Sequence, residues 1–236
     1  MSELSSHLLL FGGSGAIGSS IANHFESKGW RITRVVRSAS EASDEIFWNP
    51  IDDHSADITG ALSDRGVFDA VCWSQGANCN DSIYSFDQKT HEDLYRANVM
   101  YVMRSLNTLL ESRLLAQKTR MCVISSIWQN LARQEKLSYC VTKAALKGLV
   151  LSASNDLGRD GHLINAVLPG VIDTPMTRKN LTEAQIEKVS QGTQFNRLPT
   201  LDDVASAVFM LCSPENTGLT GQFINVDLGY SNVRII

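Results

Sequence analysis

Short apolar runs alternate with segments of helical periodicity along the whole chain, and this alternation narrows the folds that the chain can adopt. Strands are predicted near His7–Phe11, Arg31–Val36, Glu45–Trp48, Phe68–Ser74, Arg120–Ser125, Leu163–Leu168 and Gln222–Val226. Helices are predicted near Ala16–Lys28, Ala56–Arg65, Thr90–Leu115, Ser138–Gly158 and Leu201–Leu211. Strands that are apolar along nearly their whole length are typical of parallel sheets buried on both faces. The pattern therefore predicts an α/β fold, a doubly wound parallel sheet of about seven strands with helices on both faces.

The composition is ordinary for a globular protein. The 236 residues are 43% hydrophobic and 19% charged, and no linker, repeat or composition shift divides them, so we predict one domain spanning residues 1–236. The net charge is −4 and the basic residues are scattered, which argues against nucleic-acid binding. The amino terminus has no basic region, and the apolar run Leu8–Phe11 is too short for a signal peptide or a membrane span. A cytoplasmic protein without a membrane partner is the expectation.

The cysteines and histidines suggest neither a disulfide framework nor a metal site. The five cysteines are odd in number and include no C-x-x-C pair. Cys72 and Cys122 lie in apolar, strand-like runs, so we expect buried, reduced thiols. The five histidines show no ligand spacing, and neither a metal site nor a Cys/His nucleophile pair is predicted.

A glycine-rich turn follows the first predicted strand. Gly13, Gly15 and Gly18 satisfy the pattern G-x-G-x-x-G, and apolar residues then recur on one helical face. Such a turn brings the backbone close to a pyrophosphate and points a helix N-terminus at its negative charge. The position between the first strand and the first helix favours dinucleotide binding and a Rossmann-like sheet, with a purely structural glycine turn as the alternative.

The end of the second strand indicates which dinucleotide would bind. NAD sites usually carry an acidic residue there for the ribose 2′-hydroxyl, whereas a 2′-phosphate requires cations. This chain has Arg37 and Ser38 at the strand end and no carboxylate before Glu41. A guanidinium can bind phosphate through two parallel hydrogen bonds, and a hydroxyl can add another. We predict NADP(H) as the cofactor, with NAD(H) less favoured; Arg34 is the alternative phosphate ligand, or else a solvated strand residue.

Tyr139 and Lys143 lie four residues apart in a segment that is rich in Ala, Leu and Lys and is predicted to be helical. This spacing places both side chains on one face of the helix, one turn apart. An ammonium stabilises the charged form of a neighbouring phenol, so the pair can exchange a proton with an alcohol or carbonyl oxygen. The pair alone also fits a surface contact at helical spacing, and its context decides between the two.

Several further motifs, taken with these features, resemble those of the short-chain dehydrogenase/reductase family. Residues 69–76 resemble the family's D-x-L-V-N-N-A-G, and Asn98, within residues 96–99, matches its helix asparagine. Residues 124–126 match I-S-S, and residues 165–176 resemble N-x-V-x-P-G-x-x-x-T-x-M. Residues 197–205 and 220–227 resemble the C-terminal signature. Ser126 lies thirteen residues before Tyr139, which is the family's spacing for its catalytic serine. The resemblance extends over essentially the whole chain.

The resemblance implies an enzyme that transfers a hydride between a nicotinamide cofactor and a carbonyl or secondary alcohol. It also implies a catalytic tetrad: Tyr139 as general acid or base, Lys143 as its assistant and a ligand of the nicotinamide ribose, Ser126 as a donor to the substrate oxygen, and Asn98 as the holder of a water that links Lys143 to solvent. Cofactor contacts are implied for Gly12, Ser14, Gly15, Ala16, Ile17, Arg37, Ser38, Ser74, Gln75, Gly76, Tyr139, Lys143, Pro169, Gly170, Val171, Ile172 and Thr174.

Three departures from the family pattern concern the cofactor and the end of the chain. Ala16 replaces the middle glycine of the commonest G-x-x-x-G-x-G spacing, and Gly15 lies one place earlier, so the pyrophosphate contact is expected to differ slightly. Trp73 and Ser74 replace two asparagines, and Leu228 interrupts the usual V-D-G-G.

The substrate is less constrained than the cofactor. Loops after strand ends border the ligand crevice, so we expect residues 173–196 to form a substrate lid, with a variable surface excursion as the alternative. Trp128 fits either an apolar carbonyl compound or ordinary packing. Arg133, Arg178 and Lys179 are candidates for an anionic substrate or an acyl-carrier protein, or are solvated charges. Similarity to 3-oxoacyl-[acyl-carrier-protein] reductases makes a 3-oxoacyl thioester the leading candidate among many ketones.

Two other classes of function also fit this fold: a regulatory protein that binds NADP(H) without chemistry, and a scaffold subunit that binds the cofactor poorly. The presence of both Tyr139 and Lys143 favours an enzyme. Relatives in the family are commonly tetramers, so a homo-oligomer, a dimer or a tetramer, is expected. The helices at 90–115 and 138–158 would form one interface, and the apolar tail Val233–Ile236 would be buried at a contact between subunits.

Overall fold

The computed structural model describes residues 5–37, 42–51 and 58–233. Within these residues, seven parallel strands form one sheet in the order β3-β2-β1-β4-β5-β6-β7. The strands are β1 (His7–Phe11), β2 (Arg31–Val36), β3 (Glu45–Phe47), β4 (Phe68–Trp73), β5 (Leu115–Ile124), β6 (Leu163–Pro169) and β7 (Phe223–Val226). The predicted Rossmann-like, doubly wound parallel sheet is confirmed.

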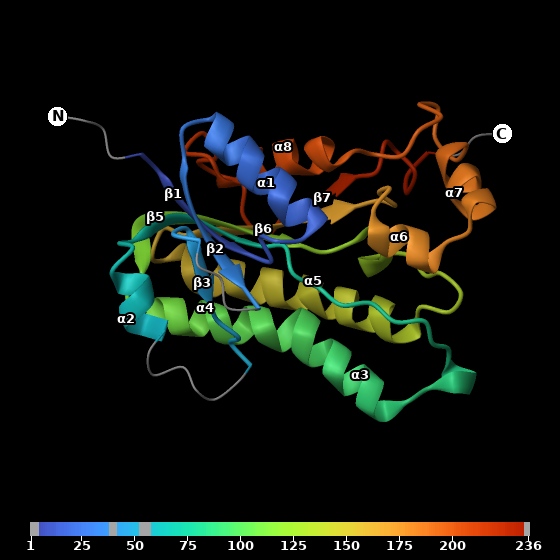
Figure 1. Cartoon of the computed structure of the whole chain (residues 1–236), viewed down its shortest axis with the longest axis horizontal. Coiled ribbons are helices and arrows are strands. Elements are labelled where there is room, and N and C mark those ends of the chain that lie inside the picture. Colours follow the sequence, from blue (N-terminus) through green and yellow to red (C-terminus); the bar gives the residue numbers. More distant parts are fainter. Residues whose placement is uncertain (1–4, 38–41, 52–57, 234–236) are drawn as a thin grey trace.

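Helices cover both faces of this sheet (Figure 1). The longer ones, α1 (Ala16–Ser27) and α8 (Leu201–Cys212), pack together on one face, and α4 (Tyr101–Glu111) and α5 (Leu137–Gly158) lie on the other. The shorter elements are α2 (Ile58–Ser63), α3 (Gln88–Tyr95), the π turn η3 (Arg96–Met100), α6 (Pro175–Asn180), α7 (Glu183–Ser190), and the 3-10 turns η2 (Ile83–Ser85) and η4 (Ile127–Gln129).

The central strand β1 shows why the apolar runs are continuous. All five of its residues are buried. Leu8 and Leu10 join the apolar cluster that contains residues of α1 and α8, whereas Leu9 and Phe11 join the cluster that contains residues of α4 and α5. Successive side chains of a strand point to opposite faces, so a strand covered on both sides needs an apolar residue at every position.

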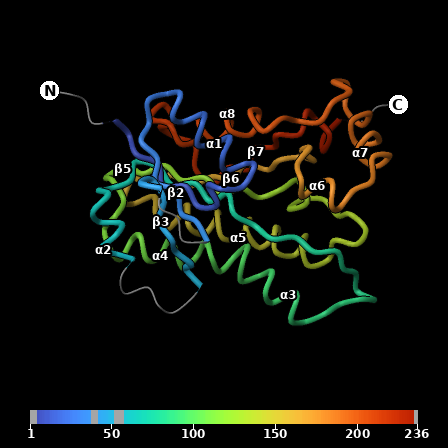
Figure 2. The backbone as a smooth tube through the Cα atoms, in the orientation of Figure 1, coloured from blue at the N-terminus to red at the C-terminus, as the bar shows by residue number. Residues whose placement is uncertain are grey.

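The strand order places a crevice at the carboxyl ends of β1 and β4. The chain puts β2 and β3 on one side of β1, and β4 with the later strands on the other, so the order reverses between β1 and β4. In open α/β sheets, ligands bind outside the carboxyl ends of the strands at such a reversal. These ends point toward α6 and α7, and Figure 2 shows the chain leaving β6 at this edge and entering both helices.

The helix predicted for residues 90–115 begins earlier than expected and is not α-helical throughout. Its first element, α3, starts at Gln88 because the Asp87 carboxylate accepts a hydrogen bond from the backbone N of Thr90 at 2.7 Å. The helix then continues through the π turn η3 into α4. The π turn was not predicted, since no residue pattern in the segment marks it.

The same helix ends at Glu111, before the predicted Leu115. A Schellman motif ends it: the backbone N of Leu114 donates to the carbonyl of Leu109 at 3.0 Å, and the N of Arg113 donates to the carbonyl of Leu110 at 3.1 Å. Arg113 has a φ of 53°, the left-handed conformation that glycine usually supplies. The prediction ran too far because the usual glycine stop signal is missing.

Strand β5 begins at Leu115, earlier than the predicted Arg120, and its pairing with β4 shifts between Phe68 and Ala70. Most other predicted boundaries agree with the structure to within one or two residues. Ala56, the predicted start of the second helix, lies outside the described residues.

Residues 173–196 are more regular than predicted. They contain helix α7, which begins with a capping box formed by Thr182 and Gln185. A second helix, α6, was not predicted. Thr174 caps it, and Pro175 occupies its first turn, as proline does at helix starts.

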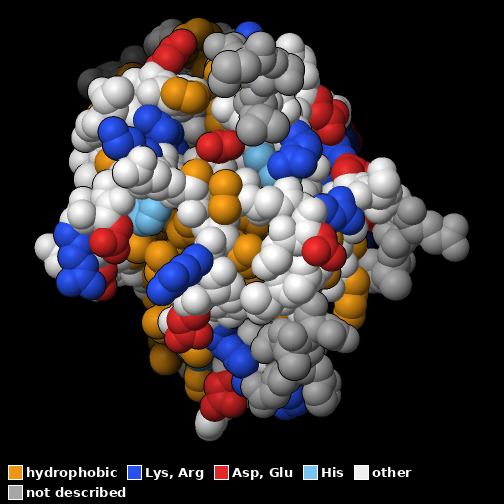
Figure 3. Space-filling view, turned by 90° about the vertical axis from the view of Figure 1, so that its left-hand side faces the viewer, with side chains coloured by type: hydrophobic (Ala, Val, Ile, Leu, Met, Phe, Trp, Pro, Cys, Tyr) orange, Lys and Arg blue, Asp and Glu red, His pale blue; other side chains and the backbone are white. Residues whose placement is uncertain are grey.

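The described residues also bear on the cysteines, on metals and on membranes. Cys72 and Cys122 are free and fully buried, as predicted, and lie opposite each other on β4 and β5. In the described part of the chain, no three His, Cys, Asp or Glu side chains are grouped to hold a metal ion, and no helix is long and apolar enough to cross a membrane. On the face at the amino ends of the strands, Lys and Arg side chains are interspersed with Asp and Glu (Figure 3).

We expect Arg113→Gly to stabilise the fold relative to Arg113→Ala by about 0.5–1 kcal/mol. The left-handed conformation costs a residue with a Cβ about 1–2 kcal/mol, and the greater freedom of glycine in the unfolded chain offsets part of the gain. Arg113 is exposed, so little packing is lost in either variant. Urea unfolding of the two variants measures the difference, and a less stable glycine variant would contradict the assignment of the Schellman motif.

Candidate active site

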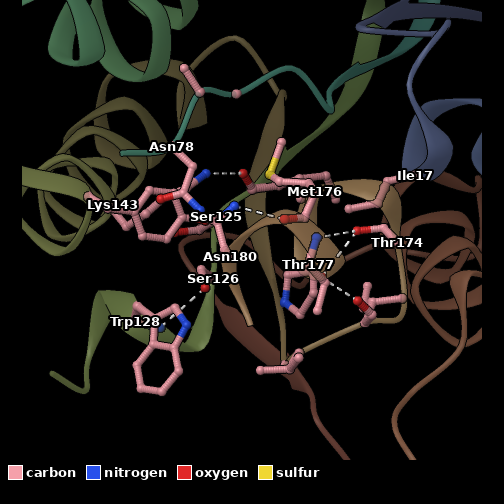
Figure 4. Close-up of a pocket in the computed structure, with 18 of the residues that line it drawn as sticks. Ile17, Asn78, Ser125, Ser126, Trp128, Lys143, Thr174, Met176, Thr177 and Asn180 are labelled. Atoms are coloured by element: carbon pink, nitrogen blue, oxygen red, sulfur yellow. Dashed lines mark hydrogen bonds between the residues drawn. The ribbon is translucent and has the colours of Figure 1, made fainter. Parts of the chain in front are cut away.

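A cavity of about 180 Å³ lies at the carboxyl edge of the sheet (Figure 4). The predicted site residues that line it are Ile17, Ser74, Gln75, Gly76, Ser126, Tyr139, Lys143, Pro169, Gly170, Val171, Ile172 and Thr174. The predicted residues that do not line it are Gly12, Ser14, Gly15, Ala16, Arg37 and Asn98. Ser38 lies outside the described residues. The fold therefore brings together residues from the ends of β1, β4, β5 and β6.

Ser126, Tyr139 and Lys143 meet on the wall of this cavity. Tyr139 and Lys143 project from the first turns of α5, and Ser126 is the N-cap residue of η4. The Ser126 hydroxyl lies close enough to the Tyr139 phenol to lower its pKa, and Lys143 Nζ lies 5.6 Å from the centre of the Tyr139 ring. Lys143 is 4% exposed, and its Nζ donates to the carbonyl of Ile124 at 3.1 Å.

Burial controls the protonation of this pair. It raises the pKa of Tyr139 to about 12, and the nearby Ser126 hydroxyl opposes the rise. It also lowers the pKa of Lys143 to about 8. Near neutral pH, Tyr139 is therefore a protonated phenol that can donate, and Lys143 is an ammonium that begins to lose its proton near pH 8.

Asn98 lies behind the cavity rather than on its wall. It is 2% exposed and belongs to the π turn η3. Its Oδ1 accepts from the backbone N of Ala77 at 2.7 Å, and its Nδ2 donates to the carbonyl of Ala77 at 3.1 Å and to Thr142 Oγ1 at 3.0 Å. The side chain clamps the loop after β4 against α5. A role in holding a water for Lys143 stays a prediction.

The glycine turn has the geometry that a pyrophosphate requires. Gly12 has a φ of +75°, and a Cβ on it would lie 2.6 Å from the backbone N of Gln75. A Cβ on Gly18 would overlap the carbonyl oxygen of Gly12, so the turn packs tightly on α1. Gly15 is the N-cap of α1, and the first turn has neither a side-chain cap nor an acidic residue. Its backbone N–H groups are therefore suited to bind an anion.

The two arginines at the end of β2 have different surroundings. Arg34 pairs with Glu26 at 2.6 Å and also forms an ion pair with Asp44. Its aliphatic part covers Gly13, where a Cβ would lie 2.9 Å from it. Arg37 is exposed and has no ion pair with a described residue. Because carboxylates already occupy Arg34, Arg37 is the better of the two candidates for a 2′-phosphate.

The segment after β4 borders both Phe11 and Lys143. Ser74 donates to the carbonyl of Phe11 through its N at 3.0 Å and its Oγ at 2.6 Å. A Cβ on Gly76 would lie 3.7 Å from Lys143 Nζ. Trp73 is buried, and its Nε1 donates to Ser105 Oγ at 2.8 Å. The change to tryptophan at this family position therefore serves the core rather than the cavity.

The segments after β6 and β7 complete the edge. A Cβ on Gly170 would lie 2.9 Å from Asp227 Cβ, so the two segments approach closely. Thr174 lines the cavity, but its hydroxyl already accepts from the backbone N of Thr177 at 3.2 Å as the cap of α6. Leu228, which interrupts the family's glycine pair, takes the left-handed conformation with a φ of 55°.

Several lining residues were not predicted individually, although four of them lie in residues 173–196, the predicted lid. These lining residues are Ala77, Asn78, Ile124, Ser125, Lys136, Met176, Thr177, Asn180 and Leu181. Four of them belong to the unpredicted helix α6 or its end, and Lys136 precedes Tyr139 by three residues, a position with no family signature. Of the candidates for substrate contact, Trp128 and Arg133 line the cavity, whereas Arg178 pairs with Asp173 at 2.6 Å and, like the exposed Lys179, does not.

Comparison with known proteins agrees with this geometry. Residues 52–231 match the family model described as enoyl-(acyl carrier protein) reductase. The chain belongs to the short-chain dehydrogenase/reductase family. The 3-oxoacyl-[acyl-carrier-protein] reductase FabG of Rickettsia felis is 27% identical to it, with 94% of this chain and 95% of that protein covered. Nodulation protein G of Rhizobium meliloti is 25% identical, with 95% and 96% covered.

The fold of this short-chain dehydrogenase/reductase is also found among solved structures. A gluconate 5-dehydrogenase from Burkholderia cenocepacia, solved in complex with NADP and tartrate, superposes with a TM-score of 0.89 at 20% identity, covering 98% of this chain and 97% of that one. At this identity the likeness shows the fold alone. The family match makes the chain an oxidoreductase that acts on CH–OH or C=O groups with a nicotinamide cofactor.

We expect the Lys143 ammonium to titrate near pH 8, well below ordinary lysines, because burial penalises its charged form. Carbon-13 NMR of lysine Cε resonances in the cofactor-free protein measures this titration, and the spectrum of Lys143→Arg assigns the resonance by its disappearance. A Lys143 midpoint above about pH 10, the range of exposed lysines, would contradict the expectation.

Proposed function

We propose that this chain is an NADP(H)-dependent oxidoreductase that transfers a hydride between nicotinamide and a carbonyl or secondary alcohol, with Tyr139 as the general acid or base. One observation carries the proposal. The Ser126 hydroxyl and the Tyr139 phenol lie together beside the buried Lys143, on the wall of a cavity that Ile17 of α1 also lines. A phenol held next to an ammonium and open to a cavity is suited to proton transfer at a substrate oxygen.

Each member of this cluster has a distinct task. When bound, the nicotinamide supplies the hydride, or accepts it in the oxidative direction. In reduction, the neutral phenol of Tyr139 donates its proton to the oxygen of the former carbonyl. The Ser126 hydroxyl donates a hydrogen bond to the same oxygen and stabilises its developing negative charge. The charge of Lys143 stabilises the phenolate that remains, which lowers the cost of a proton transfer from a group whose pKa burial raises to about 12.

The glycine turn and the end of β2 would hold the nucleotide. The uncapped N-terminus of α1, with the exposed residues Ser14, Gly15 and Ala16, fits the pyrophosphate. Arg37 fits a 2′-phosphate, and this fit is our reason for preferring NADP(H) to NAD(H). Gly76 lets the backbone pass close to Lys143, where the nicotinamide ribose would lie.

The substrate proposed first is a ketone, with a 3-oxoacyl thioester as the specific candidate that the FabG relatives suggest. Residues 173–196 would act as the lid, since Met176, Thr177 and Asn180 of α6 contribute to the cavity wall. A homo-oligomer is also proposed. The half-exposed Met103 of α4 and Val141 and Leu151 of α5 offer apolar surface for it, whereas the tail residues 234–236 lie outside the described residues.

We expect Tyr139→Phe to lose nearly all turnover, by about 10²–10⁴-fold, because the variant lacks the proton donor but keeps the ring. NADPH binding, followed by the fluorescence of the reduced nicotinamide, should remain within about fivefold of the original protein, since one lost hydrogen bond is worth about 1 kcal/mol or less. Retained turnover in Tyr139→Phe would refute the acid role of Tyr139. If the unchanged protein itself neither bound NADPH nor turned over a substrate, a scaffold function would be indicated instead.

We expect Arg37→Gln to weaken NADPH binding by about tenfold or more while changing NADH binding little, because only NADPH carries the 2′-phosphate. Arg65→Gln is the matched control, since this half-buried arginine hydrogen-bonds the carbonyl of Ser43, just before the start of the neighbouring strand β3. Equal turnover of the unchanged protein with NADH and NADPH would overturn the preference for NADP(H).

A further inference from the structure

The cavity that contains Tyr139 has an excess of positive charge. Three cationic side chains line it, Arg133, Lys136 and Lys143, and among the described residues no Asp or Glu does. Lys143 has a task in the proposed chemistry, whereas Arg133 and Lys136 have none. Removing a cation from water without an opposing charge costs free energy, so the two further cations indicate a ligand that supplies negative charge.

Lys136 is held in place by neutral groups only. It is 3% exposed, and its Nζ donates to Asn78 Oδ1 at 2.9 Å, to the carbonyl of Cys79 at 3.0 Å, to Asn80 Oδ1 at 2.5 Å and to Asn180 Oδ1 at 3.2 Å. An ammonium has three protons, so four acceptors must share them. The contact with Asn180 is the longest of the four, and a carboxylate oxygen would form a stronger, charge-assisted bond in its place.

Other charges near Lys136 do not neutralise it. Arg133 is half-buried and forms no hydrogen bond or ion pair with a described residue. Burial, and then Arg133, lower the pKa of Lys136, while Asp81 opposes them. The Asp81 carboxylate, however, is 8% exposed and accepts from the backbone N of Ser138 at 3.0 Å, which commits it to the start of α5.

The position of Lys136 separates its ligand from the nucleotide. Asn78, one of its partners, lies with Lys143 on one side of the cavity, and Ile17 and Thr174 lie on the other (Figure 4). Ile17 belongs to the helix that follows the glycine turn, so a pyrophosphate bound there is not the anion that faces Lys136. Lys136 Nζ lies 6.0 Å from the centre of the Tyr139 ring, close to the 5.6 Å of Lys143 Nζ.

The cavity relates the anion to the reacting carbon. A substrate oxygen must reach the Tyr139 hydroxyl, and Lys136 and Arg133 line the same cavity of about 180 Å³, so a negative group on a small substrate can reach them. Resting on the proposed oxidoreductase function, we propose that the substrate is a small oxo acid, or the matching hydroxy acid, whose carboxylate binds Lys136 and Arg133. The charge of the cavity thus favours an acid over the 3-oxoacyl thioester that similarity to the FabG relatives suggests. Asn180 of α6 gives up its contact with Lys136 when the carboxylate binds.

Matched pairs of substrates test this proposal. NADPH consumption is followed with short 2-oxo and 3-oxo acids, with the amides of the same acids, and with a 3-oxoacyl coenzyme A thioester. We expect kcat/KM for the best acid to exceed that for its amide by about tenfold or more, because a hydrogen bond to a charged group is worth about 1.5–3 kcal/mol. The ratio of acid to amide should fall by about tenfold in Lys136→Gln and in Arg133→Gln.

Lys118→Gln is the matched control, because it removes the same charge from an exposed position on β5 outside the cavity lining. Its ratio of acid to amide should equal that of the unchanged protein. Circular dichroism shows whether each variant is folded. If Lys136→Gln does not fold, the ratio of acid to amide kcat/KM in the unchanged protein is compared with that in Arg133→Gln, and this comparison tests the oxo-acid proposal.

The failures of the two proposals are distinguishable. An amide or a thioester turned over as well as the acids would overturn the oxo-acid proposal and leave the oxidoreductase intact. A second contrary result is a ratio of acid to amide kcat/KM that stays unchanged in both variants while the two rates fall together. That result would likewise overturn the oxo-acid proposal, and it would show that Lys136 has a structural role, connecting α6 to the loop after β4. Absence of NADPH consumption with every acid, amide and thioester would count against the oxidoreductase proposal itself.

Discussion

The hydrogen bond from Lys143 to the carbonyl of Ile124 is the contact on which the candidate site depends. It ties the first turns of α5 to the end of β5, the strand that leads directly into Ser126. A buried ammonium must find acceptors, and the last carbonyl of a central strand is an acceptor whose position the sheet determines. Tyr139 lies one helical turn away and therefore meets Ser126. The Asn98 clamp on Ala77 then holds the loop after β4 beside the same lysine.

Burial gives the site its electrostatic character. Each of the three lining cations lies where water is partly excluded, and none faces a carboxylate on the cavity wall among the described residues. The same burial that keeps Tyr139 protonated also lowers the pKa of Lys143 to about 8, so the pKa values of the phenol and the ammonium shift in opposite directions from one cause. A ligand that brings negative charge would relieve the lysines, and this is the physical link between the chemistry proposed for Tyr139 and the substrate class proposed from Lys136.

Sequence reasoning succeeded where a residue type has one strong structural meaning and failed where geometry arises from contacts. The glycine turn, the i, i+4 pair and the apolar strands were found because their patterns follow directly from backbone conformation and helical spacing. The end of α4 was misplaced because Arg113 occupies a left-handed position that no residue preference marks. Helix α6 was missed although Thr174 and Pro175 are usual start signals, because a helix of six residues shows no periodic pattern. The π turn was missed because no residue pattern marks it. The clamping contacts of Asn98 and the lining role of Lys136 have no local signal, since their partners lie 21 to 58 residues away in the chain.

The sequence by itself determined the fold class, the positions of the strands along the chain up to small boundary shifts, and the placement of Tyr139 and Lys143 on one helical face, because hydrophobic periodicity and short motifs are local properties. Only the tertiary structure decided that Arg34 is occupied by Glu26 and Asp44 while Arg37 is not, and that Trp73 serves the core. It also decided that α6 brings Asn180 to Lys136 across the cavity. These outcomes depend on which side chains, distant in the sequence, are packed together. The burial and the electrostatic environment of a residue are set by all of its neighbours in space, and a local stretch of sequence does not contain them.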